Sequence, residues 1–147
     1  LGKIGDWTHL NMAIASLTDG TYTKFSLQFM LGYTLSPLTW LMGVNGHDMT
    51  LVGQLLGEKI ILNEMIGYAS LKEMLTAGVF FDQKSIIIAV YVLCGFANFS
   101  SVGIQIGGIS AIAPNQRKTL SSLGFRALLG GGMTALVSAT LVAMILG

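Results

Sequence analysis

Charged side chains are scarce in this sequence. Lys and Arg number 8, Asp and Glu number 7, and together they make up 10% of the 147 residues. A soluble domain carries about 25% charged residues, so a soluble chain with so few could not easily cover its surface. The formal net charge is +1, which excludes a basic field for nucleic acid and an acidic tail.

Cysteine is nearly absent. The single cysteine, Cys94, excludes an intrachain disulfide, and the sequence around it holds no cluster of metal-ligating residues. Because Cys94 lies inside an apolar run, we expect it to be buried as a small hydrophobic side chain.

A secretory leader is not recognisable either. Residues 1–24 mix charged and small polar groups, without the basic start and apolar core of a signal peptide. We interpret 1–24 as a polar connecting segment. Since the sequence starts at Leu1 rather than at methionine, we also expect the natural protein to begin upstream of it.

The sequence contains long stretches without any charged residue. Hydrophobic residues make up 52% of the chain, and the mean hydropathy is +0.69. A membrane-spanning helix needs about 20 mostly apolar residues. Three uncharged stretches reach that length, at residues 25–47, 85–116 and 127–147. This pattern predicts an all-α membrane protein.

The last stretch, 127–147, carries small residues at every fourth position. On a helix they form one stripe, which lets another helix approach closely inside lipid. The opposite face is also apolar, which favours a membrane span over a buried helix of a soluble protein. The stripe consists of Ala127, Gly131, Ala135, Ala139, Ala143 and Gly147.

The middle stretch is interrupted near its centre by Gly95, Asn98, Ser100 and Ser101. Transporters use such breaks, because half-helix ends and side-chain oxygens meet the substrate near the membrane midplane. An ordinary helix whose polar groups bond neighbouring helices has the same pattern. The pattern alone leaves both interpretations open for residues 85–113.

The earlier part of the chain is also open to two interpretations. Residues 25–47 fit either a span or an interfacial helix, and Pro37 predicts a kink or an end there. Residues 48–73 hold two short apolar runs separated by Gly57, which fits a re-entrant hairpin. The alternative is a surface helix pair, with Glu58 and Lys59 solvated.

Basic residues crowd the connection before the last span. Arg117, Lys118 and Arg126 lie there with no acid nearby. The positive-inside rule therefore predicts that loop 114–126 is cytoplasmic.

Several phrases of the sequence match one family in order, and together they cover roughly residues 25–147. The chain resembles the carboxy-terminal region of concentrative nucleoside transporters. The phrases are Gly32-Tyr33, SPLTWLMGV (36–44), LLGEKIILNEMIGY (55–68), CGFANFSSVGIQIGG (94–108), the AP-Q-RK pattern at 113–118 and RALLGG (126–131).

The resemblance implies a cation-coupled importer of nucleosides, driven by sodium or protons, in the cell (inner) membrane. It implies that the protein assembles as a homotrimer. It also implies that the protein is not an enzyme, needs no cofactor and binds no nucleic acid. Each substrate site lies between two inverted halves. This chain looks like the second half, with 48–73 as a re-entrant hairpin, 85–113 as a broken helix and 127–147 as the last span. The coupling-ion site is expected mostly upstream, and no metal site is expected here.

The resemblance also assigns four substrate-binding residues. Glu64 matches a hairpin glutamate that bonds ribose hydroxyls, Asn98 and Ser101 match sugar-binding residues, and Phe96 matches an aromatic that packs against the base. The chemistry agrees, because a carboxylate accepts strong hydrogen bonds from vicinal hydroxyls. Met65 departs from the aromatic residue usual after that glutamate.

Other interpretations remain for the same residues. Glu64 could be a headgroup-level acid paired with a lysine, and Phe96 could serve packing alone. A membrane-embedded structural or gating segment would use Glu64, Asn98 and Ser101 as polar packing groups. A soluble helical enzyme is the third class, but the sequence offers no nucleophile with a base and no phosphate-binding loop.

We predict that this chain partitions with membranes and needs detergent to stay in solution, because its long uncharged stretches suit lipid. Membrane fractionation followed by size-exclusion chromatography tests this. A monodisperse monomer recovered without detergent would refute the assignment for the isolated chain.

Overall fold

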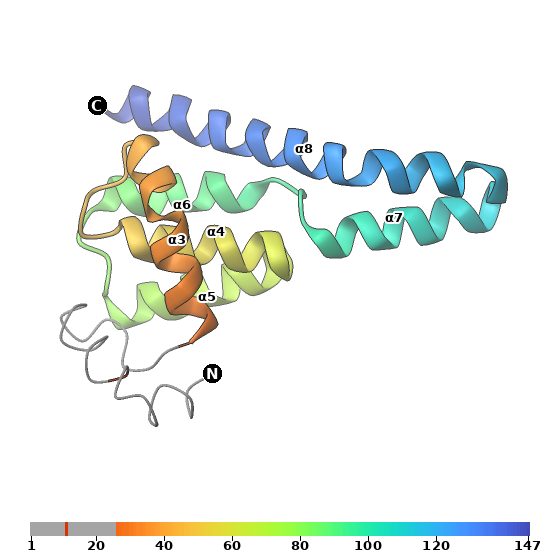
Figure 1. Ribbon diagram of the computed structural model, residues 1–147. Coiled ribbons are helices and arrows are strands. Elements are labelled where there is room, and N and C mark those ends of the chain that lie inside the picture. The colour runs from red at the N-terminus through yellow and green to blue at the C-terminus, as the bar shows by residue number, and fades with distance from the viewer. Residues whose placement is uncertain (1–10, 12–25) are drawn as a thin grey trace.

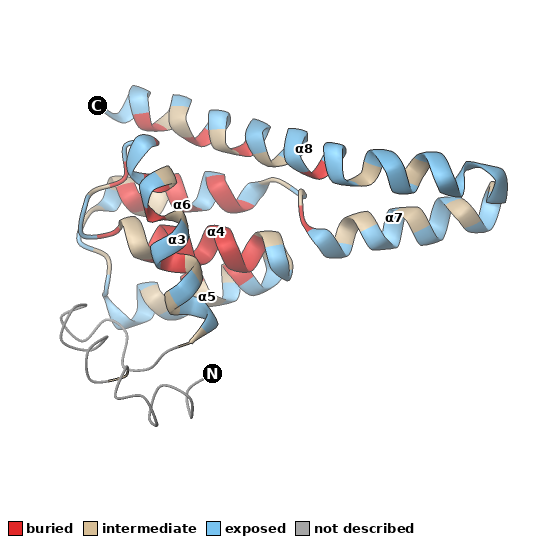
Figure 2. Cartoon of the chain, viewed as in Figure 1, coloured by how far each residue is buried: buried red, intermediate tan, exposed pale blue. Residues whose placement is uncertain are grey.

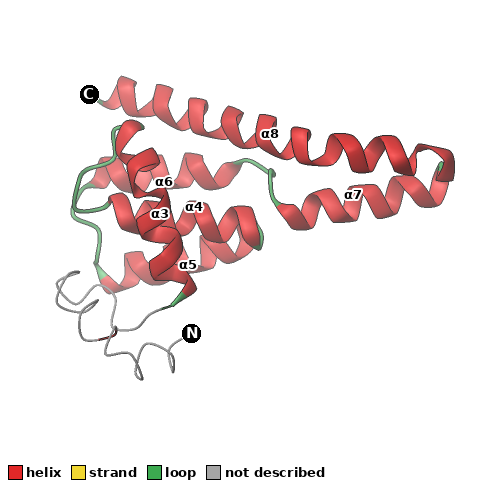
Figure 3. Cartoon of the chain, viewed as in Figure 1, coloured by secondary structure: helices red, strands yellow, loops and turns green. Residues whose placement is uncertain are grey.

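The computed structural model describes residue 11 and residues 26–147, and the part from 26 onward is all helical (Figures 1 and 3). The elements are α3 (Leu27–Leu41), α4 (Met49–Ile61), α5 (Glu64–Ala77), α6 (Gln83–Cys94), α7 (Phe99–Ile112), the 3₁₀ turn η1 (Pro114–Gln116) and α8 (Arg117–Leu146). Helices α3, α4, α5 and α6 lie together at one end as a four-helix body, and α7 and the first part of α8 extend away from them side by side. The segment 1–24 lies outside the described residues except for Asn11.

Helix α3 runs through Pro37, so the expected end there is wrong. Proline has no N–H and leaves the carbonyl four residues earlier, that of Tyr33, without its helical partner. The Ser36 hydroxyl donates to the Tyr33 carbonyl oxygen at 2.9 Å and replaces the missing bond. With 15 residues, α3 is about 22 Å long, shorter than the hydrocarbon core of about 30 Å.

Helix α4 packs against α3 through glycines. A Cβ at Gly53 would lie 2.7 Å from the Gly32 carbonyl oxygen, and one at Gly57 would lie 2.7 Å from the Leu31 Cβ. Neither position therefore has room for a side chain. At the other end of the contact, the buried Thr39 hydroxyl donates to the Met49 carbonyl at 2.8 Å. This close approach is the arrangement expected for helices inside lipid.

Helices α4 and α5 form the expected hairpin, with its turn at Leu62 and Asn63. Its second arm extends to Ala77, beyond the expected end at residue 73, and ends at Gly78 with φ 64°. The arms of 13 and 14 residues are each about 20 Å long, too short to span a membrane.

The middle of the hairpin is buried. Glu58 and Lys59 are only 3% and 1% exposed, so a surface helix pair with both side chains solvated is wrong.

Asp48 stabilises the end of the hairpin opposite its turn. It is buried just before α4, and its carboxylate oxygens accept hydrogen bonds from the backbone N–H groups of Phe81 (2.8 Å) and Asp82 (2.9 Å). These bonds tie the segment between α5 and α6 back to the start of α4, which closes the four-helix body.

The stretch 85–113 is broken, as one of its two interpretations required. Helix α6 ends at Cys94 and α7 begins at Phe99, and an extended connection joins them (Figure 3). Cys94 is exposed, so its expected burial is wrong. It is the last residue of α6, while the burial on that helix falls on residues such as Ile88, Ala89 and Val92.

Helix α8 runs antiparallel to α6 and α7 and lies alongside both (Figure 1). It begins at Arg117, ten residues before the expected last span, so most of the expected loop 114–126 is helical. Its 30 residues are about 45 Å long, roughly 15 Å more than a hydrocarbon core. Arg117, Lys118 and Arg126 all lie in this extra length, exposed.

The small-residue stripe of α8 faces the body. Ala135, Ala139 and Ala143 are buried (Figure 2), whereas Ala127 and Gly131 lie exposed farther along the helix. A Cβ at Gly95 would lie 2.9 Å from the Ala135 Cβ, which shows how closely α8 passes the break. The hydrophobic core lies among α4, α5, α6 and α8, around Val52, Leu55, Ile88, Val92, Leu93 and Ala139.

We predict that Ala139→Leu destabilises the full-length protein. Ala139 is 0% exposed, and overpacking such a position costs about 1–3 kcal/mol. Ala139→Ser, which is almost as small, is the matched control. The measurement is the unfolding temperature in detergent. Equal unfolding temperatures for the two variants would mean that the stripe does not mediate close helix packing.

Candidate functional site

The hairpin turn places Glu64 at the first position of α5. Asn63 caps this helix, since its side-chain oxygen accepts from the Ile66 N–H at 3.0 Å. A carboxylate in the first turn is favoured by the partial positive charge of the helix N-terminus. The local sequence therefore presents a half-buried carboxylate at the tip of the hairpin.

Asn98 makes the central contacts of the site. It is 1% exposed and caps α7, its oxygen Oδ1 accepting from the Ser101 N–H at 2.7 Å. Its nitrogen Nδ2 donates to Glu64 Oε2 at 2.9 Å. The Asn98 side chain thus pairs a backbone N–H that has no partner within α7, and it also links the break between α6 and α7 to the hairpin tip. The structure brings three of the predicted site residues together, Glu64, Asn98 and Ser101.

This contact also bears on the alternative pairing of Glu64 with a lysine. The hydrogen bond described for the Glu64 carboxylate comes from Asn98. Lys59 instead donates to the Val92 carbonyl oxygen at 2.8 Å, and Lys72 is exposed on α5.

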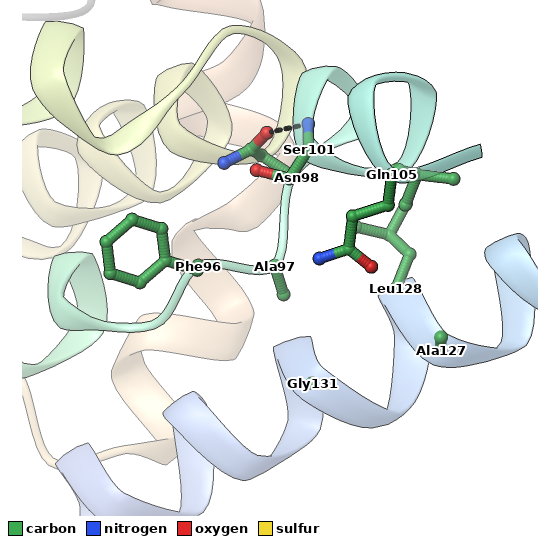
Figure 4. Close-up of a pocket in the computed structure, with 9 residues that line it drawn as sticks. Phe96, Ala97, Asn98, Ser101, Gln105, Ala127, Leu128 and Gly131 are labelled. Carbon is green, nitrogen blue, oxygen red and sulfur yellow. Dashed lines mark hydrogen bonds between the residues drawn. The ribbon is translucent and has the colours of Figure 1, made fainter. Parts of the chain in front are cut away.

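A pocket of about 300 Å³ opens beside Asn98, between the break, α7 and α8 (Figure 4). Phe96 lines it but is 74% exposed, and its ring points away from the other labelled lining residues. Phe96 therefore shares this pocket with Asn98 and Ser101, whereas Glu64 is not one of its lining residues. The lining residues are Phe96, Ala97, Asn98, Ser101, Val102, Gln105, Ala127, Leu128 and Gly131.

Gln105 is the polar lining residue that the sequence analysis missed. It follows Ser101 by four residues, so both lie on the same face of α7. This four-residue spacing could have identified Gln105 as a lining residue from the sequence. Among the described residues, no group of three or more His, Cys, Asp or Glu is placed to hold a metal ion.

Comparison with known proteins decides the family. The sequence profile described as "Na+ dependent nucleoside transporter C-terminus" matches residues 2–143. The chain belongs to this nucleoside transporter family. Its members are transporters rather than enzymes, and they are membrane proteins. In the described part of this chain, two segments are long and apolar enough to cross a membrane, Gln83–Ile112 and Pro114–Leu146.

Curated relatives of the family are similar over most of this chain. NupX of Escherichia coli (strain K12) is 40% identical over 122 residues, which are 83% of this chain and 29% of that protein. Sodium/nucleoside cotransporter 1 of Mus musculus is 36% identical over 143 residues, which cover 88% of this chain and 22% of that protein. The chain thus spans less than a third of the length of these relatives.

Solved structures of the family share the fold. The transporter CNTnw in an inward-facing substrate-bound state matches with a TM-score of 0.77 and 32% identity, covering 95% of this chain and 34% of that one. A CNTnw variant in an intermediate state matches with a TM-score of 0.81 and 31% identity, covering 97% of this chain and 32% of that one.

We predict that two substitutions of Asn98 separate its two contacts. Asn98→Ser keeps a good N-cap oxygen but is too short to reach Glu64, whereas Asn98→Ala loses both contacts. The Ala variant of the full-length protein should be less stable than the Ser variant by about 1 kcal/mol, the usual value of a cap. Thermal unfolding in detergent measures this. Ala and Ser variants of equal stability would show that α7 does not depend on this cap.

Proposed function

We propose that the full-length protein imports nucleosides across the cell (inner) membrane by coupling to a sodium or proton gradient, and that this chain supplies the ribose-binding part of the site. The observation that carries the proposal is the bond between Asn98 and Glu64, which joins a carboxylate of the hairpin to the start of a half-helix. Glu64 lies at the start of α5 and Asn98 at the start of α7, and each of these helices is too short to span a membrane by itself.

The hydrogen-bonding capacity left over at this contact suits a ribose. In the described part of the chain, Asn98 uses one of its two Nδ2 protons and Glu64 uses one oxygen, Oε2. The other amide proton, Glu64 Oε1 and the Ser101 hydroxyl are available to a ligand. Vicinal ribose hydroxyls can both donate and accept, so they match one carboxylate oxygen and one amide donor.

A re-entrant hairpin would carry the Glu64 carboxylate into the membrane, and this supports the same assignment. A charged side chain near the bilayer centre costs about 3 kcal/mol or more, so it is rarely placed there without a function. Helix dipoles also help, because the N-termini of α5 and α7 meet at this point and favour a carboxylate. Phe96, exposed two residues before Asn98, is available to pack against the base.

The proposal includes an assembly and an orientation. We expect a homotrimer whose protomers each carry one site, with the coupling ion bound mostly by residues upstream of this chain. The exposed Arg117, Lys118 and Arg126 at the start of α8 support a cytoplasmic location for that end, by the positive-inside rule.

A membrane-embedded segment without its own substrate site is the competing function. It would use Glu64, Asn98 and Ser101 only to join the hairpin to the broken helix. The unused capacity of this contact and the pocket beside Asn98 favour the transporter.

We predict that Glu64→Gln keeps the fold of the full-length protein and weakens ribonucleoside binding about tenfold. Glutamine is nearly isosteric but uncharged. A hydrogen bond to a charged group is worth about 1.5–3 kcal/mol and a neutral one about 1 kcal/mol, and about 1.4 kcal/mol corresponds to a factor of ten. The measurement compares uptake or binding of ribose and deoxyribose nucleosides.

The loss should shrink for the deoxynucleoside that lacks the hydroxyl bonded by Glu64. Glu73 is an exposed acid on the same helix, so Glu73→Gln is the matched control and should change the binding of neither nucleoside. If Glu64→Gln weakens every nucleoside equally, the carboxylate serves structure or ion coupling, and the ribose assignment fails.

A further inference from the structure

Helix α6 ends without a cap from its own backbone. At the ends of α3, α4, α5 and α7, the C-cap N–H donates back into the last turn. Gly95, the C-cap of α6, is extended, and in the described part of the chain its N–H makes no such bond. The last carbonyl groups of α6 therefore need partners from elsewhere.

Lys59 supplies one of these partners. Its ammonium nitrogen Nζ donates to the Val92 carbonyl oxygen at 2.8 Å, across 33 positions of sequence. Lys59 is 1% exposed, the largest of the fully buried side chains described. Burying an ammonium group costs a great deal unless it is compensated. Its position at a helix C-terminus offsets part of this cost, because the carbonyl dipoles there carry a partial negative charge, and the Glu64 carboxylate adds a favourable charge interaction.

The space around this ammonium group is closed. A Cβ at Gly95 would lie 3.3 Å from Lys59 Nζ and 2.9 Å from the Ala135 Cβ. In transporters with broken helices, half-helix C-terminal ends coordinate the mobile sodium ion or proton. In this chain the same kind of position is filled by the amino group of Lys59.

Both arms of the hairpin hold this helix end. Lys59 lies on α4, five residues before Glu64, and Tyr68 lies on α5, four residues after it. The Tyr68 hydroxyl donates to the Val90 carbonyl oxygen at 3.2 Å. The tip that carries Glu64 is thus fastened to the end of α6 from both sides, just before the break that carries Asn98.

We propose that Lys59 is a positioning residue for the substrate site, a tethered cation that takes the place of a mobile ion at the end of α6 and keeps Glu64 in register with Asn98. The proposal rests on the proposed function for its substrate. Its geometric part, that Lys59 orders the break, holds independently of what is transported.

The experiment uses the full-length protein with three variants. Lys59→Met removes charge and donor, Lys59→Arg keeps both, and Lys72→Met removes an exposed lysine of α5 as the control. Hydrogen exchange in detergent reports on the break, and nucleoside KM and Vmax in proteoliposomes report on the site.

We expect Lys59→Met to speed exchange in residues 91–101 about tenfold, the approximate value of a hydrogen bond to a charged group. Exchange in α3 should not change, and nucleoside KM should rise about tenfold with Vmax within twofold of wild type. Lys59→Arg keeps the charge but needs more room, so it should be less impaired than Lys59→Met in both measurements, and Lys72→Met should match the wild type.

Three results would overturn the proposal: unchanged exchange at the break in Lys59→Met, exchange raised equally in all helices, or an Arg variant as impaired as the Met variant. If Lys59→Met does not reach the membrane, Lys59→Arg decides by the same measurements. Failure of both to fold, with Lys72→Met normal, would assign Lys59 to the fold as a whole. A wild-type protein that takes up no nucleoside would refute the proposed function, while the exchange data would still decide the role of Lys59.

Discussion

A helix that breaks inside a membrane leaves backbone N–H and carbonyl groups without partners, and lipid cannot supply them. The break between α6 and α7 lies in a segment that is long and apolar enough to cross a membrane, so this constraint applies to it. On one side Asn98 caps the start of α7, and on the other Lys59 and Tyr68 bond carbonyl groups of α6. Lys59 and Tyr68 belong to the two helices of the hairpin. The hairpin must therefore pack against the end of α6 for these carbonyl groups to have partners.

The same partners build the candidate site. Asn98 caps α7 with its oxygen and bonds Glu64 with its nitrogen, so the group that makes the break stable also positions the carboxylate. The small residues have a parallel role. Gly53 and Gly57 let α3 approach α4, and Gly95 lets α8 pass close to the break. Close helix packing thus holds the polar groups of the break and of the hairpin tip together.

Much of this arrangement could be predicted from sequence. Charge spacing located the apolar segments, the polar interruption located the break, and the motif resemblance selected Glu64, Asn98 and Ser101, which the structure brings together. The hairpin was predicted from two short apolar runs on either side of Gly57, though the turn itself falls later, at Leu62 and Asn63.

Other features depend on contacts that no local pattern encodes. Pro37 does not end α3 because the Ser36 hydroxyl replaces the lost bond. The burial of Lys59 depends on a carbonyl 33 positions away, and the exposure of Cys94 depends on which face of α6 meets the core. The start of α8 at Arg117 was missed because the prediction was based on hydrophobicity, and a helix can continue past the apolar stretch into water.

The central claim is that Glu64 and Asn98 together hold the ribose. The most direct measurement is a structure of the full-length transporter with a bound ribonucleoside. The account predicts ribose hydroxyl oxygens at hydrogen-bond distance, roughly 2.5–3.0 Å, from the Glu64 carboxylate, with Asn98 bonded to the same sugar. A nucleoside bound elsewhere, with Glu64 and Asn98 bonded only to each other, would contradict the account.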